Sequence, residues 1–159
     1  MSIERVRAFF AEKGIQERIR EFTVSSATVE LAALALGCEG ARIAKTLSFA
    51  LGERTVLIVA AGDAKVDNHK YKERFGAKAK MLPASEVEAR VGHAVGGVCP
   101  FAVNDGVEVY LDSSLLRFKT VFPACGSANS AIELTLPELE ALSSSLGYVD
   151  VCKLPEETA

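Results

Sequence analysis

The stretch that most constrains the fold is an apolar run at residues 55–61, Thr-Val-Leu-Ile-Val-Ala-Ala. A strand with one face in water alternates apolar and polar residues, whereas an unbroken apolar run is typical of a strand covered on both faces. Gly52 and Glu53 precede the run and predict a hairpin turn, which joins it to an alternating strand at residues 43–49. We therefore expect a central strand with helices packed over the sheet.

Helical and extended patterns are mixed along the rest of the chain without strict alternation. We predict helices at residues 2–13, 27–36, 67–75, 84–91 and 136–144, and further strands at residues 15–24, 78–82, 107–111, 120–124, 131–135 and 147–153. Ser25 or Ser26 is expected to cap the second helix and Asp67 the third, while Gly37 ends the second. These elements predict an α/β (α+β) fold with a mixed sheet.

Length and composition are those of an ordinary globular domain. The chain has 159 residues, of which 49% are hydrophobic and 25% charged, enough for one core. We predict a single domain over residues 1–154 and a disordered tail over residues 155–159. We see neither an apolar run of membrane-spanning length nor a secretory leader, so we expect a cytoplasmic protein without a membrane partner.

One segment of this acidic chain carries a local excess of positive charge. A net charge of −3 argues against a general nucleic-acid-binding protein, and we expect no DNA partner. Residues 65–80, however, contain six basic residues against two acidic ones. Such a patch can hold phosphates through salt-sensitive contacts, and the alternative is a solvated helix face. Lys65, Lys70 and Lys72 are the predicted RNA contacts.

Cysteine and histidine give little support to metal or nucleophile chemistry. None of the four cysteines forms a CxxC pair, a pattern typical of a reducing compartment. His69 and His93 have no cysteine at metal-ligand spacing, so we predict no metal site and no cofactor. Two histidines also give a Ser-His-Asp or Cys-His enzyme little basis. A redox function of Cys99 or Cys125 is a weaker alternative, because buried structural cysteine is the commoner case.

Lys45 is the most unusual residue of the predicted strand at residues 43–49. Alternation puts it on the same face as Ile43, Leu47 and Phe49. Burying an unpaired ammonium costs several kcal/mol. Two explanations stay open. The stem can lie on the core while the head reaches water, or the amine can lie in a cleft and hold an anionic or carbonyl-bearing substrate.

A glycine-rich loop at residues 96–101, Gly-Gly-Val-Cys-Pro-Phe, is the second candidate site. Adjacent glycines allow a tight turn and a close approach of backbone N–H groups to a ligand. Such amides can stabilise a carbonyl oxygen that becomes an oxyanion. The alternative is a plain turn between a helix and a strand.

A polar loop at residues 126–130, Gly-Ser-Ala-Asn-Ser, is the third candidate. Its hydroxyls, amide and flexible backbone can line a pocket. They can equally form a hydrogen-bonded turn, which is the usual role of these residue types.

Four motifs follow one another in order along nearly the whole chain. They are Ile43 to Phe49 with its Ile-Ala-Lys-Thr-Leu start; Gly62, Asp63, Val66, Asp67 and Lys70; Gly96, Gly97, Pro100 and Phe101; and Gly126 before Ile132, Glu133 and Leu134. Together they resemble the YbaK family of bacterial aminoacyl-tRNA deacylases, which is related to the editing domain of prolyl-tRNA synthetase. The resemblance implies a single mixed-sheet domain with helices packed around a curved β-sheet.

The resemblance also implies an activity and a site. The activity is that of a trans-editing enzyme, a hydrolase that cleaves the carboxylic ester of mischarged tRNA, typically tRNA for proline carrying cysteine or alanine. An aminoacyl ester is already activated, so hydrolysis needs positioning and charge stabilisation more than a strong nucleophile. Lys45 and Gly97 are the implied catalytic residues, with the amine facing the glycine loop across a pocket. The implied substrate-binding residues are Phe22, Gly96, Cys99, Pro100, Ala124, Gly126 and Ser127.

Partners and alternatives follow from the same resemblance. The expected partners are the acceptor end of a mischarged tRNA and prolyl-tRNA synthetase. In the cysteine-specific branch the thiol of the substrate is expected to attack the ester. A non-catalytic module that binds a tRNA end or an aminoacyl-adenylate analogue is the alternative from another class.

Four positions depart from the family pattern. Phe22 stands where the cysteine-specific branch has tyrosine, Ala124 where it has serine, and Ala131 where an aspartate is expected. Phe122-Pro123 stands where the alanine-specific branch has a histidine-proline pair. The amino-acid specificity therefore stays open.

Overall fold

A hairpin of two long strands forms the centre of the fold, in a computed structural model that describes residues 2–155. The antiparallel strands are β2 (Ile43–Leu51) and β3 (Arg54–Ala61). Every residue from 55 to 61 is buried, because helices and loops cover both faces of β3. The prediction of a central strand at this apolar run is confirmed.

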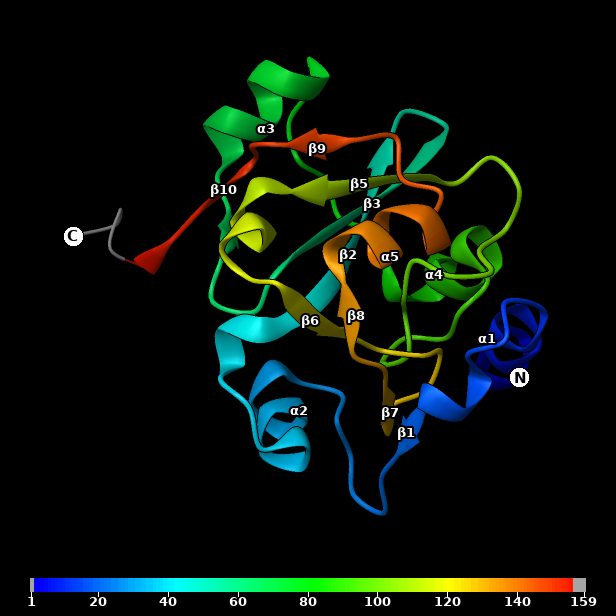
Figure 1. Cartoon of the computed structure of the whole chain (residues 1–159). Helices are drawn as coiled ribbons and strands as arrows, with labels where there is room; N and C mark the ends of the chain where they lie inside the picture. Colours follow the sequence, from blue (N-terminus) through cyan, green and yellow to red (C-terminus); the bar gives the residue numbers. More distant parts are fainter. Residues whose placement is uncertain (1, 156–159) are drawn as a thin grey trace.

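Four shorter strands extend the hairpin into a curled six-stranded sheet with the order β8-β6-β2-β3-β5-β9 (Figure 1). Parallel pairs join β6 to β2, β5 to β3 and β9 to β5, while β8 is antiparallel to β6. Two small pairs, β1 with β7 and β4 with β10, lie outside this sheet. The strands other than the hairpin are β1 (Arg20–Glu21), β4 (Lys65–Val66), β5 (Glu108–Asp112), β6 (Thr120–Pro123), β7 (Ser130–Ala131), β8 (Leu134–Thr135), β9 (Tyr148–Val149) and β10 (Cys152–Lys153).

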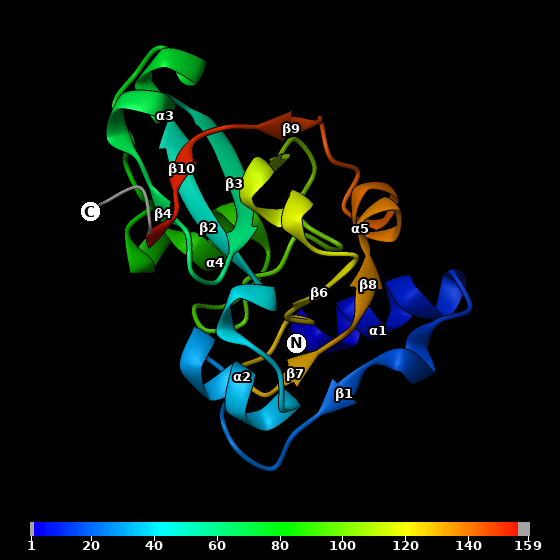
Figure 2. The same cartoon turned by 60° about the vertical axis from the view of Figure 1, so that its left-hand side comes forward.

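Five α-helices within the described residues surround the sheet, which confirms the predicted α/β (α+β) mixed-sheet architecture. Figures 1 and 2 show α2 at one end of the molecule and α3 at the opposite end. Figure 2 shows the paired strands β10 and β4 side by side below α3. The helices are α1 (Ser2–Glu12), α2 (Val29–Leu36), α3 (Asn68–Phe75), α4 (Ala84–Val91) and α5 (Leu136–Leu142), with 3₁₀ turns at Gln16–Arg18, Gly40–Arg42 and Ser113–Arg117. None of these helices is both long and apolar enough to cross a membrane.

The helix ends follow local chemistry that the sequence largely predicts. Asp67 caps α3 as expected, because its carboxylate accepts hydrogen bonds from the first free backbone N–H groups of the helix. Gly37 ends α2 in the left-handed conformation. The cap of α2 is Thr28 rather than Ser25 or Ser26, so this helix begins two residues later than predicted.

The strand predicted at residues 15–24 is wrong in most of its length. The segment forms the 3₁₀ turn Gln16–Arg18 and the two-residue strand β1. Ile15 and Ile19 are half-buried while Glu17, which would share their face of a strand, is exposed, so the burial does not alternate. Arg18 fixes the turn by donating to the Glu138 carboxylate at 2.8 Å and to the Glu133 carbonyl oxygen at 2.6 Å.

Three other predicted strands are divided or shortened. Residues 131–135 split because β7 pairs with β1 whereas β8 pairs with β6. Residues 147–153 split into β9 on the main sheet and β10 against β4. Residues 78–82 form only an isolated bridge between Met81 and Phe49. Residues 156–159 of the predicted tail lie outside the described residues.

The loop at residues 92–101 is anchored to the core at its far end. The Phe101 ring is fully buried and packs against Phe10 of α1, with 5.0 Å between ring centroids. The buried His93 places its Nε2 atom 2.7 Å from the Phe101 carbonyl oxygen. These contacts hold the loop, including Gly96 and Gly97, at a fixed position beside β2.

Candidate functional site

A cavity of about 430 Å³ lies along the outer edge of β2. Two segments pair with this edge, but at separate places. Strand β6 pairs at Ile43 and Ala44, and Met81 forms a bridge at Phe49. The two segments diverge between these points, so residues 45–47 have no strand neighbour on this side. The cavity fills the resulting gap.

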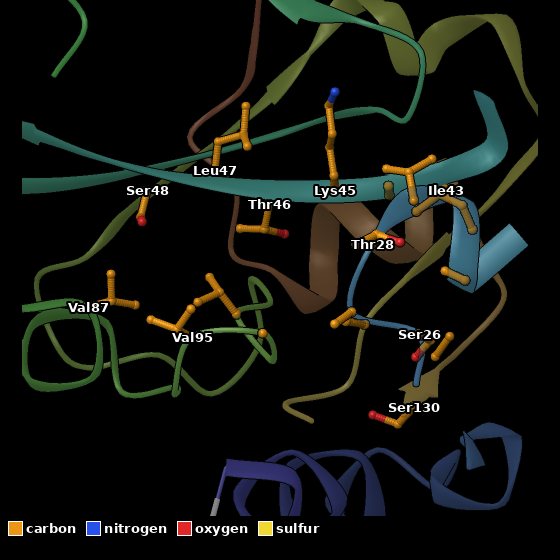
Figure 3. Close-up of a pocket in the computed structure, with 18 of the residues that line it drawn as sticks. Ser26, Thr28, Ile43, Lys45, Thr46, Leu47, Ser48, Val87, Val95 and Ser130 are labelled. Carbon is orange, nitrogen blue, oxygen red and sulfur yellow. The ribbon is translucent and has the colours of Figure 1, made fainter. Parts of the chain in front are cut away.

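Several elements that are distant in sequence form the walls of the cavity (Figure 3). Strand β2 forms one wall, and α4 with the glycine-rich loop forms the facing one. The start of α2 and strand β7 close the far end. The lining residues used below are Ser26, Thr46, Ser48, Val87, Val95, Gly96, Ala124 and Ser130. Among the described residues that line the cavity there is no carboxylate and no imidazole.

Two hydroxyl groups on β2 point into the cavity without a hydrogen-bond partner. Figure 3 shows the side chains of Thr46 and Ser48 on the side of β2 that faces Val87 and Val95 across the cavity. Ser48 is only 7% exposed, and neither hydroxyl has a partner among the described residues. A buried hydroxyl without a partner costs free energy, about 1–3 kcal/mol when fully desolvated. The two hydroxyl groups can therefore form hydrogen bonds with a polar group of a bound ligand.

The hydroxyl groups at the other end of the cavity are already engaged. Ser130 Oγ lies 2.6 Å from Ser127 Oγ, and Ser26 Oγ donates to the Ala128 carbonyl oxygen at 3.3 Å. These bonds join the polar loop to the segment before α2. The hydroxyl groups that line the cavity near β7 therefore have hydrogen-bond partners, whereas the hydroxyl groups of Thr46 and Ser48 have none in the part of the chain that the structure describes.

Lys45 directs its amine away from the cavity, although its stem forms part of the wall (Figure 3). Its Nζ atom donates to the carbonyl oxygens of Ala64 and of Gly62, the latter at 3.3 Å. Desolvation by burial lowers the pKa of the amine, and the nearby Lys65 lowers it further, while Cys152 and Asp63 oppose these effects. The expectation that the amine faces the glycine loop is wrong, because the carbonyl groups after β3 supply its acceptors on the opposite face of β2.

Gly97 has a packing role that the sequence did not reveal. A Cβ atom on this buried residue would lie 2.7 Å from the backbone oxygen of Gly126, so the two loops touch through their main chains. The Gly97 N–H donates to the Ala94 carbonyl oxygen at 3.0 Å and is not free to stabilise an oxyanion. The neighbouring Gly96, with φ of +93°, lines the cavity itself.

The other predicted substrate-binding residues divide into lining and supporting ones. Ala124 lines the cavity and forms a bridge with Ala131. Gly126 and Ser127 do not line the cavity but support residues that form it. Gly126 packs against Gly97, and the Ser127 hydroxyl is hydrogen-bonded to the Ser130 hydroxyl. Phe22 also supports the loop, because its N–H donates to the Asn129 carbonyl oxygen at 2.8 Å. The structure does not place Phe22 among the lining residues.

Cys99 and Pro100 are buried behind the glycine pair rather than in the cavity. Burial raises the pKa of the Cys99 thiol to about 12, and the pKa of Cys125 is raised by burial as well. All four cysteines are free, and the pKa of Cys152 is raised to about 12. A reactive thiol needs a lowered pKa, so the redox alternative has no support.

The three predicted RNA-binding lysines have different surroundings. Lys70 is tied to Asp150 at 3.2 Å and to the Cys152 carbonyl oxygen at 2.9 Å. Lys72 is exposed on α3. Lys65 on β4 lines a second hollow of about 300 Å³, to which Lys45 also contributes. Within residues 2–155 there is no group of three or more side chains that could hold a metal ion.

Sequence reasoning missed the contribution of Thr46, Ser48, Val87 and Val95. The alternation that singled out Lys45 also assigns Thr46 and Ser48 to the opposite face of the strand. The residues on that face are small and polar, and this pattern could have indicated a wall lined by hydroxyl groups. Nothing local indicates that α4 and the loop after it supply the facing wall.

Comparisons with known proteins agree with this architecture. The aminoacyl-tRNA editing domain family matches residues 23–142. The uncharacterized protein YwhH of Bacillus subtilis strain 168 is 54% identical over 154 residues, which cover 96% of this chain and 98% of that protein. A proline–tRNA ligase of Bacillus cereus strain AH820 is 26% identical over 108 residues, which cover 67% of this chain but only 19% of the ligase.

A solved structure extends the likeness to the whole fold. A crystal structure of a proposed trans-editing enzyme for prolyl-tRNA synthetase is 29% identical, with a TM-score of 0.85 and coverage of 96% of this chain and 97% of that one. The family match and this structure confirm the resemblance drawn from the four sequence motifs. The chain belongs to the aminoacyl-tRNA editing domain family.

Proposed function

We propose that the protein is a free-standing deacylase that hydrolyses the aminoacyl ester of mischarged tRNA. The observation that carries the proposal is the cavity at the open edge of β2, in a chain whose family is that of aminoacyl-tRNA editing domains. Its volume of about 430 Å³ is enough for an amino acid, and two unpartnered hydroxyl groups lie on its wall. The likeness to a proposed trans-editing enzyme and to part of a proline–tRNA ligase supports tRNA for proline as the acceptor.

The open strand edge supplies the backbone donor that the Gly97 amide does not. Along this edge Ala50 N–H donates to the Lys80 carbonyl oxygen at 2.8 Å, and the Ser48 carbonyl oxygen accepts from Leu82 N–H at 3.1 Å. Backbone groups of a strand alternate between its two edges. Those of Thr46 therefore face the gap, where the N–H can donate to the carbonyl oxygen of a bound ester as negative charge develops.

The reaction needs no protein nucleophile. Water attacks the ester carbonyl carbon, the bond to the ribose oxygen breaks, and the products are the free amino acid and uncharged tRNA. Because the ester is already activated, holding it rigidly beside a polar donor supplies much of the required acceleration. Lys45 keeps one ammonium N–H beyond its two carbonyl acceptors, and we assign it to holding the terminal nucleotide on the other side of β2.

The wall chemistry favours cysteine over alanine as the amino acid removed. Thr46 and Ser48 gain a hydrogen-bond partner only from a side chain with a polar head. The facing Val87 and Val95 suit a short apolar stem. The thiol of a cysteinyl group matches both features, whereas the alanyl methyl group leaves the hydroxyls unpaired. Cysteinyl-tRNA for proline is therefore our preferred substrate and alanyl-tRNA for proline the second.

We further propose a cellular setting for this reaction. The protein acts in the cytoplasm as one domain over residues 1–154, on tRNA that prolyl-tRNA synthetase has mischarged. Association with that synthetase would place the editing cavity near newly charged tRNA. The relation of the family to proline–tRNA ligases supports both partners.

A non-catalytic module that binds the tRNA end is the second candidate. One observation favours it: the described lining residues include no carboxylate or imidazole, and the Lys45 amine points away from the cavity. The two functions are separated by incubating the protein with cysteinyl, alanyl, seryl and threonyl esters of tRNA for proline and following ester loss. A deacylase releases the amino acid from at least one ester over repeated turnovers. Saturable binding with ester lifetimes equal to those in buffer would support the binding module instead.

A further inference from the structure

The second hollow adjoins the cavity and opens on the other face of β2. The two spaces share Lys45, Leu47 and Met81 as lining residues. The second one continues between β2, strand β4 and the first residue of α3, Asn68. A ligand whose one end fills the cavity can therefore reach this groove with its other end.

Lys65 lines the groove, and a second lysine, Lys153, stands next to Lys65 on the neighbouring strand. Lys65 of β4 is directly opposite Lys153 of β10 in an antiparallel register, so both side chains project from the same face. Like charges directly opposite on paired strands repel and destabilise the pair. Neither lysine has an ion-pair partner within residues 2–155. The Lys45 amine, bound to Gly62 and Ala64, adds a third cation on this side.

The carboxylates near these lysines are committed to other groups. Asp63 receives two hydrogen bonds from Arg117, at 3.0 and 2.6 Å. Asp67 faces Lys153 but accepts from the first free N–H groups of α3. Asp150 pairs with Lys70 at 3.2 Å. These carboxylates therefore do not neutralise Lys65 and Lys153, and the positive charge of the two lysines favours the binding of an external anion.

The floor of the groove is apolar. Leu47, Phe49 and Met81 line it, and Met81 is 57% exposed despite being a large hydrophobic residue. An apolar floor beside Lys65 and Lys153 matches a nucleotide, whose base needs a flat apolar contact and whose phosphate needs positive charge. A free inorganic anion would use only the two lysines.

We propose that this groove binds the phosphodiester backbone and a base of the single-stranded 3′ end of tRNA, with Lys65 and Lys153 on the phosphates. The inference rests on the proposed function, since it places the nucleotide end of the same substrate whose aminoacyl group fills the cavity. The open edge of β2 at residues 45–47 then lies at the junction, where the ester bond sits.

Binding of an uncharged RNA trinucleotide with the tRNA 3′-terminal sequence tests the groove directly. Fluorescence anisotropy is measured between about 50 and 200 mM salt for the wild type, Lys65→Ala, Lys153→Ala and Lys13→Ala. Lys13 is an exposed lysine after α1 and gives a control with the same charge loss. We expect Lys65→Ala and Lys153→Ala each to weaken binding roughly three- to tenfold and to flatten the slope of log K against log salt by about 0.7. Lys13→Ala should match the wild type.

A second probe separates charge from base contacts. The same trinucleotide with uncharged methylphosphonate linkages should bind more weakly to the wild type, and the two lysine variants should then lose no further affinity. Wild-type-like binding of the charged trinucleotide by both Lys65→Ala and Lys153→Ala, or an equal loss in Lys13→Ala, would overturn the groove assignment. Unfolding midpoints at or above the wild-type value are expected for both variants, because each substitution relieves the lysine repulsion.

The outcomes for the groove and for the proposed function are distinguishable. Lysine-dependent binding of the trinucleotide together with no ester hydrolysis supports the groove and removes the deacylase. If the wild type hydrolyses the ester but the lysine variants bind the trinucleotide as the wild type does, the groove assignment is wrong and the deacylase function stands.

Discussion

Gly97 packs so closely against Gly126 that a Cβ atom at position 97 would lie 2.7 Å from the Gly126 backbone oxygen. The contact joins the glycine-rich loop to the polar loop and so sets the position of Gly96 at the cavity. The neighbouring atoms are backbone, which cannot move aside as a flexible side chain can. The close approach gives Gly97 a structural reason to be glycine, independent of any role for its amide.

Gly97→Ala should therefore be destabilising. We expect the free energy of unfolding to fall by about 1–3 kcal/mol, the usual cost of overpacking a well-packed site. Urea unfolding followed by circular dichroism measures the change. Gly40→Ala is a matched control, because its Cβ atom would meet only Val29, at 3.5 Å, an ordinary contact distance. An equal loss in both variants would show that the loop contact is not the cause.

Removing the free hydroxyl groups should change amino-acid preference. In Ser48→Ala and Thr46→Val the hydrogen bond to a polar substrate side chain is lost, which corresponds to about 0.5–1.5 kcal/mol. We expect kcat/KM for the cysteinyl ester to fall roughly three- to tenfold relative to the alanyl ester. The ratio within each variant corrects for general damage. An unchanged ratio would remove these hydroxyls from substrate recognition.

Acid should weaken the link between the turn at residues 16–18 and α5. The Arg18 hydrogen bond, followed by the Thr135 N–H, lowers the pKa of Glu138 from 4.5 to about 2. A carboxylate with a lowered pKa in the folded state adds stability above the unfolded value, and that contribution disappears as pH falls from about 4.5 to about 2.

The effect is modest because the Glu138 side chain is still 36% exposed, so solvent screens its interaction with Arg18. Urea midpoints between pH 7 and pH 3 should decline less steeply in Glu138→Gln than in the wild type. Glu12→Gln, on the exposed end of α1, serves as the control. Parallel pH profiles for Glu138→Gln and the wild type would contradict the assignment.

Thiol alkylation should leave the activity intact. Cys99, Cys125 and Cys152 are buried with raised pKa values, whereas Cys38 is only half-buried. Mass spectrometry after iodoacetamide treatment near pH 7 should find Cys38 modified first in the native protein and all four cysteines in the unfolded one. Rapid labelling of Cys99 that abolishes ester hydrolysis would restore a thiol mechanism.

The sequence predicts local features well. The helix at residues 84–91 has the predicted limits, and the hairpin of residues 43–61 has the predicted turn. Hydrophobic period, turn residues and the Asp67 cap are properties of neighbouring residues, so they can be read from the chain alone.

Features that depend on distant contacts could not be predicted. The direction of the Lys45 amine depends on carbonyl groups that become available only after β3 turns at Gly62. The requirement for glycine at position 97 depends on a second loop nearly thirty residues later. The cavity itself exists because β6 and the segment at Met81 leave β2 at different points.

Single-turnover hydrolysis of cysteinyl-tRNA for proline, by the wild type and by a cavity-filling Ser48→Leu variant, tests the central claim most directly. Leucine at this 7% exposed position would occupy the space between β2 and α4. We predict that the wild type releases cysteine at least tenfold faster than buffer, and that Ser48→Leu falls close to the buffer rate while still binding the RNA trinucleotide. Equal hydrolysis by both proteins, or none by the wild type, would contradict the account.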